Sequence, residues 1–347
     1  MNGLGNLGNT CFLNSCLQAL FATTELSQLL DKNPKIKDIP DSTITKEWNE
    51  LRGLMIGNGG SVLPRKFVSQ IQQIARLKNK DIFTGWSQND MPEFLLFMID
   101  CIHTSISRKV NINIRGTTKN KTDETAVKCY TMLKDAYAKE YSEMMELFYG
   151  IYVSIIKSAN GRTTHSIKPE SFFILDLPIP QGGCRPLCLD TSLERVAFNP
   201  PAPSIYDCFD LMTATEHLTG DNAWFNEKTN QKESIQKKMS FWSLPKVLVV
   251  VLKRFSPDGR SKMNGLVDFP LAGLDLSKYV CGYNPKSYKY DLFAVCNHMG
   301  GVMGGHYTAF SRKGAVWYHC NDKSVSQIDA SQVVSPAAYC LFFRKVG

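Results

Sequence analysis

The chain has 347 residues, of which 43% are hydrophobic, and this composition excludes a disordered protein and predicts one large domain or two ordinary ones. Its net charge is +8, but the basic residues are spread out and not interleaved with aromatics, which argues against nucleic-acid binding as the main function. The 11 cysteines form no dense disulfide pattern and the N-terminus has no secretory signal, so we expect free thiols in a cytoplasmic or nuclear protein.

The N-terminal segment holds the first candidate for chemistry. Glycines and asparagines between Gly3 and Asn9 predict a loop, and Thr10 is placed to cap a helix whose apolar spacing starts at Leu13. Cys11 then lies in the first turn, where free amide groups and the helix dipole favour a thiolate. An arbitrary free cysteine is usually a small buried hydrophobe, but such a residue needs neither the glycine-rich approach nor the cap. We interpret Cys11 as a nucleophile.

Further helices are predicted in the first half of the chain. They cover the spacing from Trp48 to Met55, a short segment from about Pro64, a helix starting at Asp90, and a long helix from about Thr125 to Leu147. Asp90 and Glu93 have the spacing of a capping box, so helix capping and substrate binding are equally good explanations of these acids.

The second half is predicted to be rich in β-strands, since short alternating segments begin at Phe148. The run from Val247 to Leu252 is continuous and β-branched, which predicts a central buried strand; it is too short to cross a membrane. We therefore expect no membrane partner. Cys184 and Cys188 have no second pair at metal-site spacing, and we assign them no role.

A nucleophilic cysteine needs a base, and His306 is the strongest candidate. It follows Gly304 and Gly305 and opens a predicted strand whose partner begins near Val316. A turn at Lys313 and Gly314 would place His306 directly opposite Asn321, whose amide could then orient the imidazole. A slip of one residue would give this role to Asp322.

The motifs around these residues resemble those of the ubiquitin-specific proteases, the largest class of papain-like deubiquitinases. The resemblance covers nearly the whole chain and rests on two distant boxes and the motifs between them, namely Gly3–Leu20, Gln88-x-Asp90-x-x-Glu93-Phe94, Phe148-x-Gly150, Asp221-Asn222, Leu252–Phe255, Asn297-His298, Gly304–Phe310 and Trp317–Val325.

The resemblance implies an α+β, papain-like fold with a thumb, a palm and fingers in a single catalytic domain, residues 1–147 forming the helical thumb and 148–347 the β-rich palm and fingers. It implies a deubiquitinating thiol protease that hydrolyses the peptide or isopeptide bond after the last glycine of ubiquitin through an acyl-enzyme. The implied catalytic residues are Cys11 as nucleophile, His306 as base, Asn321 as third residue and Asn6 as oxyanion donor. The implied substrate-binding residues are Asp90, Glu93, Gly304, Gly305 and Tyr307.

The sequence departs from the family in the fingers. Most members hold zinc there with two Cys-x-x-Cys pairs, but the corresponding positions near Ser158, Gly161, Asn226 and Thr229 hold no cysteine. We therefore expect no metal and no cofactor. Because the chain starts ten residues before Cys11, we also expect a bare catalytic domain that acts as a monomer on ubiquitin and ubiquitinated proteins.

Two alternatives stay open at this point. One is a catalytically silent scaffold that binds ubiquitin, although such proteins usually lose the cysteine or the histidine. The other is an active protease for a different ubiquitin-like modifier.

Overall fold

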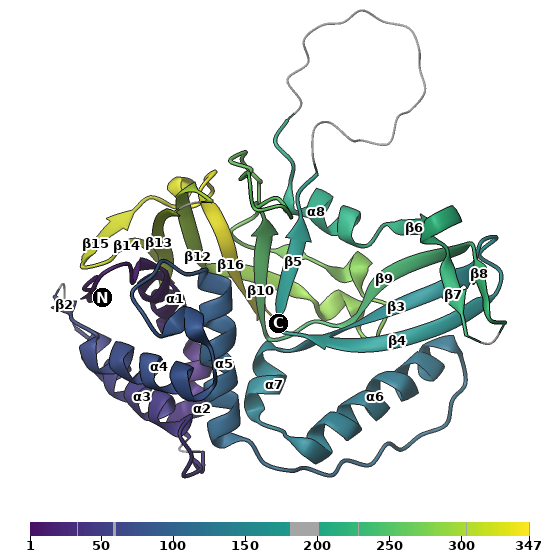
Figure 1. Ribbon diagram of the computed structural model, residues 1–347, viewed down its shortest axis with the longest axis horizontal. Coiled ribbons are helices and arrows are strands. Elements are labelled where there is room, and N and C mark those ends of the chain that lie inside the picture. Colours follow the sequence, from purple (N-terminus) through teal and green to yellow (C-terminus); the bar gives the residue numbers. More distant parts are fainter. Residues whose placement is uncertain (33, 58–59, 181–200, 228, 303, 347) are drawn as a thin grey trace, which may run out of the picture.

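A computed structural model describes residues 1–347 apart from 33, 58–59, 181–200, 228, 303 and 347. Helices from the first part of the chain gather on one side of the molecule, and the strands of the second part form the centre and the other side (Figure 1). Cys184 and Cys188 lie outside the described residues. No described helix is long and apolar enough to cross a membrane.

The helical side is built around α1 and α5, which are buried on nearly all faces because other helices and the main sheet surround them. The helix α4 instead shows one apolar face, with Phe67, Ile71 and Ile74 buried and the lysine and arginine residues outside. The elements on this side are β1 (Gly3–Leu4), α1 (Cys11–Phe21), α2 (Thr24–Asp31), α3 (Ser42–Met55), β2 (Ser61–Val62), α4 (Arg65–Leu77), η1 (Asp81–Phe83) and α5 (Met91–Ile106).

The long helix predicted up to Leu147 is wrong in its extent, because two helices occupy this region. The first, α6 (Lys121–Lys139), ends before Glu140, and α7 (Glu143–Phe148) follows. Between them Tyr141 exchanges two backbone hydrogen bonds of 2.8 Å with Arg108, which requires extended backbone. The Ser142 hydroxyl then accepts from the Met144 amide and caps α7.

The main sheet has the strand order β15-β14-β13-β12-β16-β10-β5, with β11 paired to β12. Its strand β10 confirms the predicted central strand, because it runs antiparallel to β16 and parallel to β5 and is buried except at Lys253. The strands are β5 (Ile174–Pro178), β10 (Val247–Lys253), β11 (Leu274–Asp275), β12 (Lys289–Gly301), β13 (Gly304–Lys313), β14 (Val316–Asn321), β15 (Ser324–Ile328) and β16 (Ala338–Val346).

A second sheet, with the order β4-β3-β9-β6, extends away from α1–α5, α6 packs beside its strand β4, and the small β7-β8 hairpin lies at its far end (Figure 1). The remaining elements are β3 (Gly150–Ser158), β4 (Thr164–Phe172), α8 (Ile205–Met212), β6 (Thr215–Leu218), η2 (Gly220–Asn222), β7 (Trp224–Asn226), β8 (Gln231–Glu233), β9 (Ile235–Ser243), η3 (Ser277–Tyr279), η4 (Pro285–Ser287) and η5 (Ala330–Gln332). This arrangement is an α+β fold.

Candidate active site

Cys11 is the first residue of α1 and is 3% exposed. Burial raises the pKa of its thiol, the backbone N–H of Tyr307 lowers it, and the Asp322 carboxylate raises it again. The net change is upward, so the expectation that the helix start alone favours a thiolate is wrong: loss of solvent outweighs the amide groups. Among the described hydrogen bonds none joins the Cys11 thiol to His306. The nucleophile therefore needs a base to take its proton.

Thr10 occupies the predicted cap position, but its side chain does not cap α1. Its hydroxyl instead accepts from the Leu7 amide at 3.0 Å and lies 3.2 Å from the Asn6 side-chain oxygen. That oxygen, Oδ1, also accepts from the amides of Gly8 and Thr10, at 3.0 and 3.1 Å. The loop thus fixes the oxygen of the Asn6 side chain, and the Nδ2 group of Asn6 makes no contact within the loop among the described hydrogen bonds.

His306 and Asn321 are brought together by the main sheet. Nε2 of His306 lies 2.7 Å from Oδ1 of Asn321. An amide oxygen only accepts, so Nε2 carries the proton of the neutral ring and Nδ1 remains free to accept one.

The register behind this contact differs from the predicted one. The turn between β13 and β14 consists of Gly314 and Ala315, and Lys313 pairs with Val316. Extending the pairing of Ala309 with Cys320 puts Asn321 diagonal to His306, not opposite it. The error was two residues, which preserves the face of each strand because side chains alternate with a period of two.

Asp322 does not contact the His306 ring through any described hydrogen bond. Its backbone is left-handed, with φ of 49°, and its carboxylate turns back toward α1. One oxygen accepts from Asn6 Nδ2 at 3.0 Å, and the other accepts from Asn14 Nδ2 at 2.8 Å. The carboxylate thus orients the amide of Asn6. Asn14 is a contributor that the sequence reasoning missed, although an amide in a helix of apolar neighbours was a usable signal.

Asp90 is the N-cap of α5, but its carboxylate makes no capping hydrogen bond. It accepts instead from the hydroxyls of Tyr307 at 3.1 Å and Tyr339 at 3.2 Å. Burial raises the pKa of Asp90 to about 6, against the lowering effect of these hydroxyls. Glu93 is exposed in the first turn. Both acids line a cavity of about 430 Å³.

Gly304 and Gly305 lie beside the loop that precedes Asp90, and Gln88 of this loop contacts them. The side-chain oxygen of Gln88 accepts from the Gly305 amide at 2.9 Å. A Cβ at Gly305 would lie 2.3 Å from the Met299 carbonyl oxygen and 2.4 Å from a ring nitrogen of His298, so no side chain fits there. Sequence reasoning had placed Gln88 in a motif without giving it this contact.

Of the four finger positions that lack cysteines, Ser158 and Asn226 end strands β3 and β7, and Gly161 and Thr229 lie in the turns that follow these strands. In the second hairpin Glu233 accepts from Asn226 at 2.8 Å and from Thr229 at 2.6 Å. His165 on β4 stacks beside Trp224 on β7, with ring centroids 5.6 Å apart, and so joins the two hairpins. At the positions where a zinc ribbon has thiolates this chain thus has hydroxyl and amide side chains and a glycine, and two of these side chains are bonded to Glu233.

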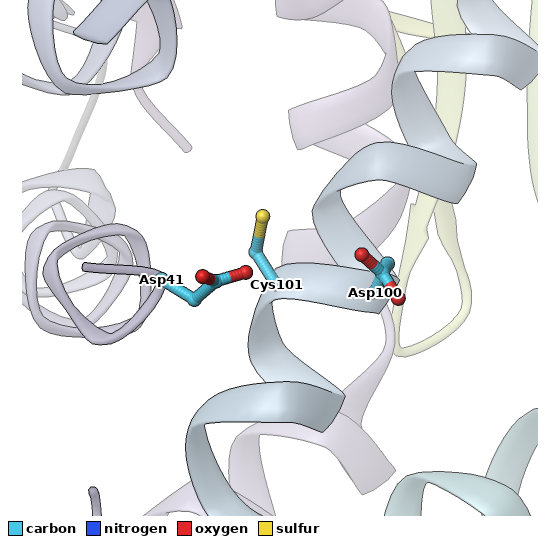
Figure 2. A group of neighbouring side chains, drawn as sticks. All are labelled: Asp41, Asp100 and Cys101. Carbon is cyan, nitrogen blue, oxygen red and sulfur yellow. The ribbon is translucent and has the colours of Figure 1, made fainter. Parts of the chain in front are cut away.

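Within the described part of the chain, one group of three potential metal ligands lies close together, formed by Asp41, Asp100 and Cys101. Figure 2 shows Asp41 reaching toward Cys101 from the start of α3, while Asp100 and Cys101 belong to α5. The ammonium of Lys78 contacts both carboxylates, that of Asp100 at 2.8 Å. The cluster is therefore an ion network that joins α3, α4 and α5.

This chain matches a known protein family over nearly its whole length. The model of the family described as "Ubiquitin carboxyl-terminal hydrolase" matches residues 2–343. The chain belongs to this family of cysteine-type hydrolases.

One similar protein is ubiquitin carboxyl-terminal hydrolase 2 of Bos taurus, which is 33% identical over 99% of this chain and 54% of its own length. The human protein of the same name is 32% identical with the same coverage. Ubiquitin carboxyl-terminal hydrolase 21 of Rattus norvegicus is 32% identical over 99% of this chain and 61% of its own length. The chain thus spans a little over half the length of these relatives.

The fold also matches a solved structure described as the SAGA DUB module of Ubp8, Sgf11, Sus1 and Sgf73 bound to monoubiquitin. The TM-score is 0.72 at 23% identity, over 100% of this chain and 69% of that chain. This likeness and the family match confirm the papain-like α+β fold that the motifs predict.

Proposed function

We propose that the chain is a deubiquitinating thiol protease that hydrolyses the peptide or isopeptide bond after the C-terminal glycine of ubiquitin. The observation that carries this proposal is the 2.7 Å contact between His306 Nε2 and Asn321 Oδ1. The residue that follows His306 on the same strand, Tyr307, directs its backbone N–H at the Cys11 thiol. A nucleophile, a base and a neutral residue that orients the base are the components of Cys-His-Asn catalysis.

In the first step His306 accepts the Cys11 proton on Nδ1, and the sulfur attacks the carbonyl carbon of the last glycine. Because burial raises the pKa of the thiol, we assign His306 the role of taking the proton of Cys11 as the sulfur attacks. Asn321 accepts from Nε2–H and keeps the ring oriented as it becomes an imidazolium.

As the sulfur adds to the carbonyl carbon, the carbonyl oxygen becomes negatively charged and needs hydrogen-bond donors. The Asn6 amide, oriented by Asp322, and the backbone N–H of Cys11 are the groups we assign to it. His306 then gives its proton to the leaving amine, which departs and leaves a thioester on Cys11. Water, activated by the same imidazole, hydrolyses the thioester and restores the thiol.

The tail of the substrate is assigned to the surface formed by Gly304, Gly305 and Tyr307 on one side and by Asp90 and Glu93 on the other. Gly304 and Gly305 present bare backbone on this surface, and such backbone suits the close approach of a substrate chain that itself ends in glycines. The two carboxylates suit the basic residues that precede those glycines in the family's substrate.

We also propose ubiquitin and ubiquitinated proteins as the partners of a monomeric chain in the cytoplasm or nucleus. The family membership and the likeness to a structure bound to monoubiquitin support ubiquitin as the partner.

The test is labelling by ubiquitin that carries an electrophile in place of its terminal carboxylate. We expect one adduct, on Cys11, and none on Cys11→Ala, which should still bind ubiquitin because its binding surface is unchanged. Parallel probes built on other ubiquitin-like modifiers separate the substrate classes. Binding without labelling would favour the silent scaffold, and labelling by another modifier alone would assign a different substrate.

A further inference from the structure

The loop between η1 and α5 contacts both the segment that precedes Cys11 and the strand β13, to which the substrate tail is assigned above. The Trp86 carbonyl accepts from the Asn9 side chain at 2.9 Å, next to the nucleophile. Farther along the loop, Gln88 accepts from Gly305, and Asp90 accepts from the hydroxyl of Tyr307. The backbone of the loop is therefore fixed at each end by catalytic or tail-binding segments.

The side chain of Trp86 takes no part in these contacts and is 51% exposed. Its ring lies beside Gly8, where a Cβ would be 3.9 Å from the Cε3 atom of the indole. Leu63 lies against Gly5, at the start of the same segment, and is 55% exposed. Two large apolar side chains thus flank the segment Gly5–Asn9, which carries the oxyanion donor Asn6.

The backbone segments beside these two side chains contain no charged residue of their own, although the Asp322 carboxylate contacts Asn6. Neither the segment 5–9 nor the segment 86–89 contains an acidic or basic residue. Exposed tryptophan and leucine around an uncharged backbone segment suit an apolar polypeptide surface better than a charged one.

An isopeptide substrate has a polypeptide on each side of the scissile bond. The tail of ubiquitin is assigned to the surface of Gly304, Gly305 and Asp90, so the polypeptide that departs with the amine must lie elsewhere around Cys11. The segment 5–9 borders the reacting carbonyl through Asn6, and Trp86 and Leu63 flank that segment.

We propose that Trp86 and Leu63 form a docking surface for the leaving polypeptide, an uncharged apolar patch next to the modified lysine. This inference rests on the proposed function and names the second partner of the same site.

The test compares two substrates that share ubiquitin and differ in the leaving group. One is ubiquitin carrying a small fluorogenic amine on its last glycine, and the other is ubiquitin joined through an isopeptide bond to a second ubiquitin. We expect Trp86→Ala to lower kcat/KM for the second substrate about tenfold more than for the first. Leu63→Ala should act in the same direction, and Trp86→Phe should retain most of the activity.

The matched control is Leu77→Ala, since Leu77 is 62% exposed at the end of α4 and has no place in the site. It should leave the ratio of the two rates unchanged. Equal losses on both substrates for Trp86→Ala would show a purely structural role and overturn the inference, as would no loss on either. A wild-type chain inactive on both substrates would instead overturn the proposed function, and the inference with it.

Discussion

His306 and Asn321 form a 2.7 Å hydrogen bond although they are diagonal neighbours across the β13-β14 pair. Diagonal positions on one face are farther apart than opposed ones, but an imidazole and an amide are long enough to span the gap. The contact requires that both side chains lie on the same face of the sheet, and it does not require that the two residues be directly opposed.

Asn321→Ala should lower kcat by roughly ten- to a hundredfold, because the imidazole loses the acceptor that fixes its orientation. Asn321→Asp should retain activity, since a carboxylate can accept the same N–H. Steady-state rates with a fluorogenic ubiquitin amide measure both. Should Asp322→Asn prove the more damaging change while Asn321→Ala stays near wild type, Asp322 would be the third member of the triad.

Asn6→Ala should lower kcat by roughly 10²–10³-fold with little change in KM, as expected for a donor that acts mainly on the transition state. Asp322→Ala should produce a smaller loss of the same kind, because the Asn6 amide would keep its backbone contacts and lose its carboxylate partner. Full kinetic curves separate the two constants. A change in KM alone would point to a loop-shaping role for Asn6.

Asp90 should make stability depend on pH. Its folded pKa of about 6 exceeds the ordinary 3.8, so the folded protein holds this proton more tightly than the unfolded chain does. The resulting stabilisation is fully present below about pH 4 and is lost as pH rises through about 6. The free energy of unfolding of the wild type, compared with Asp90→Asn, should fall by about 3 kcal/mol across this window. Denaturant titrations at several pH values measure it, and parallel curves for the two proteins would contradict it.

The purified protein should contain no stoichiometric zinc and should keep its activity in a chelator, because the finger positions that would bind zinc hold Ser158, Gly161, Asn226 and Thr229. Metal analysis and activity assays with and without chelator check this. One zinc per chain would mean that other cysteines, such as Cys184 and Cys188, act as ligands.

Local pattern in the sequence was sufficient to propose the components of the candidate site. The glycine-rich segment and the following helix predicted Cys11 as the nucleophile, and glycines before a strand predicted His306 as its base. The register error of two residues changed the pairing but kept the contact between His306 and Asn321, because an even slip leaves each side chain on its original face. The position of β10 was likewise predictable, since a continuous β-branched run is stable only when buried on both sides.

The tertiary structure decided where the remaining polar groups point. Asp90 has the spacing of a helix cap, but its carboxylate contacts Tyr307 and Tyr339, residues 217 and 249 positions away. Helix propensity cannot predict such a choice, because the competing donors exist only after the sheet has packed against α5. The direction of the pKa shift of Cys11 was decided in the same way: its place at the helix start is local, but its burial in a helix packed on β13 is not, and burial raises the pKa more than the amide groups lower it.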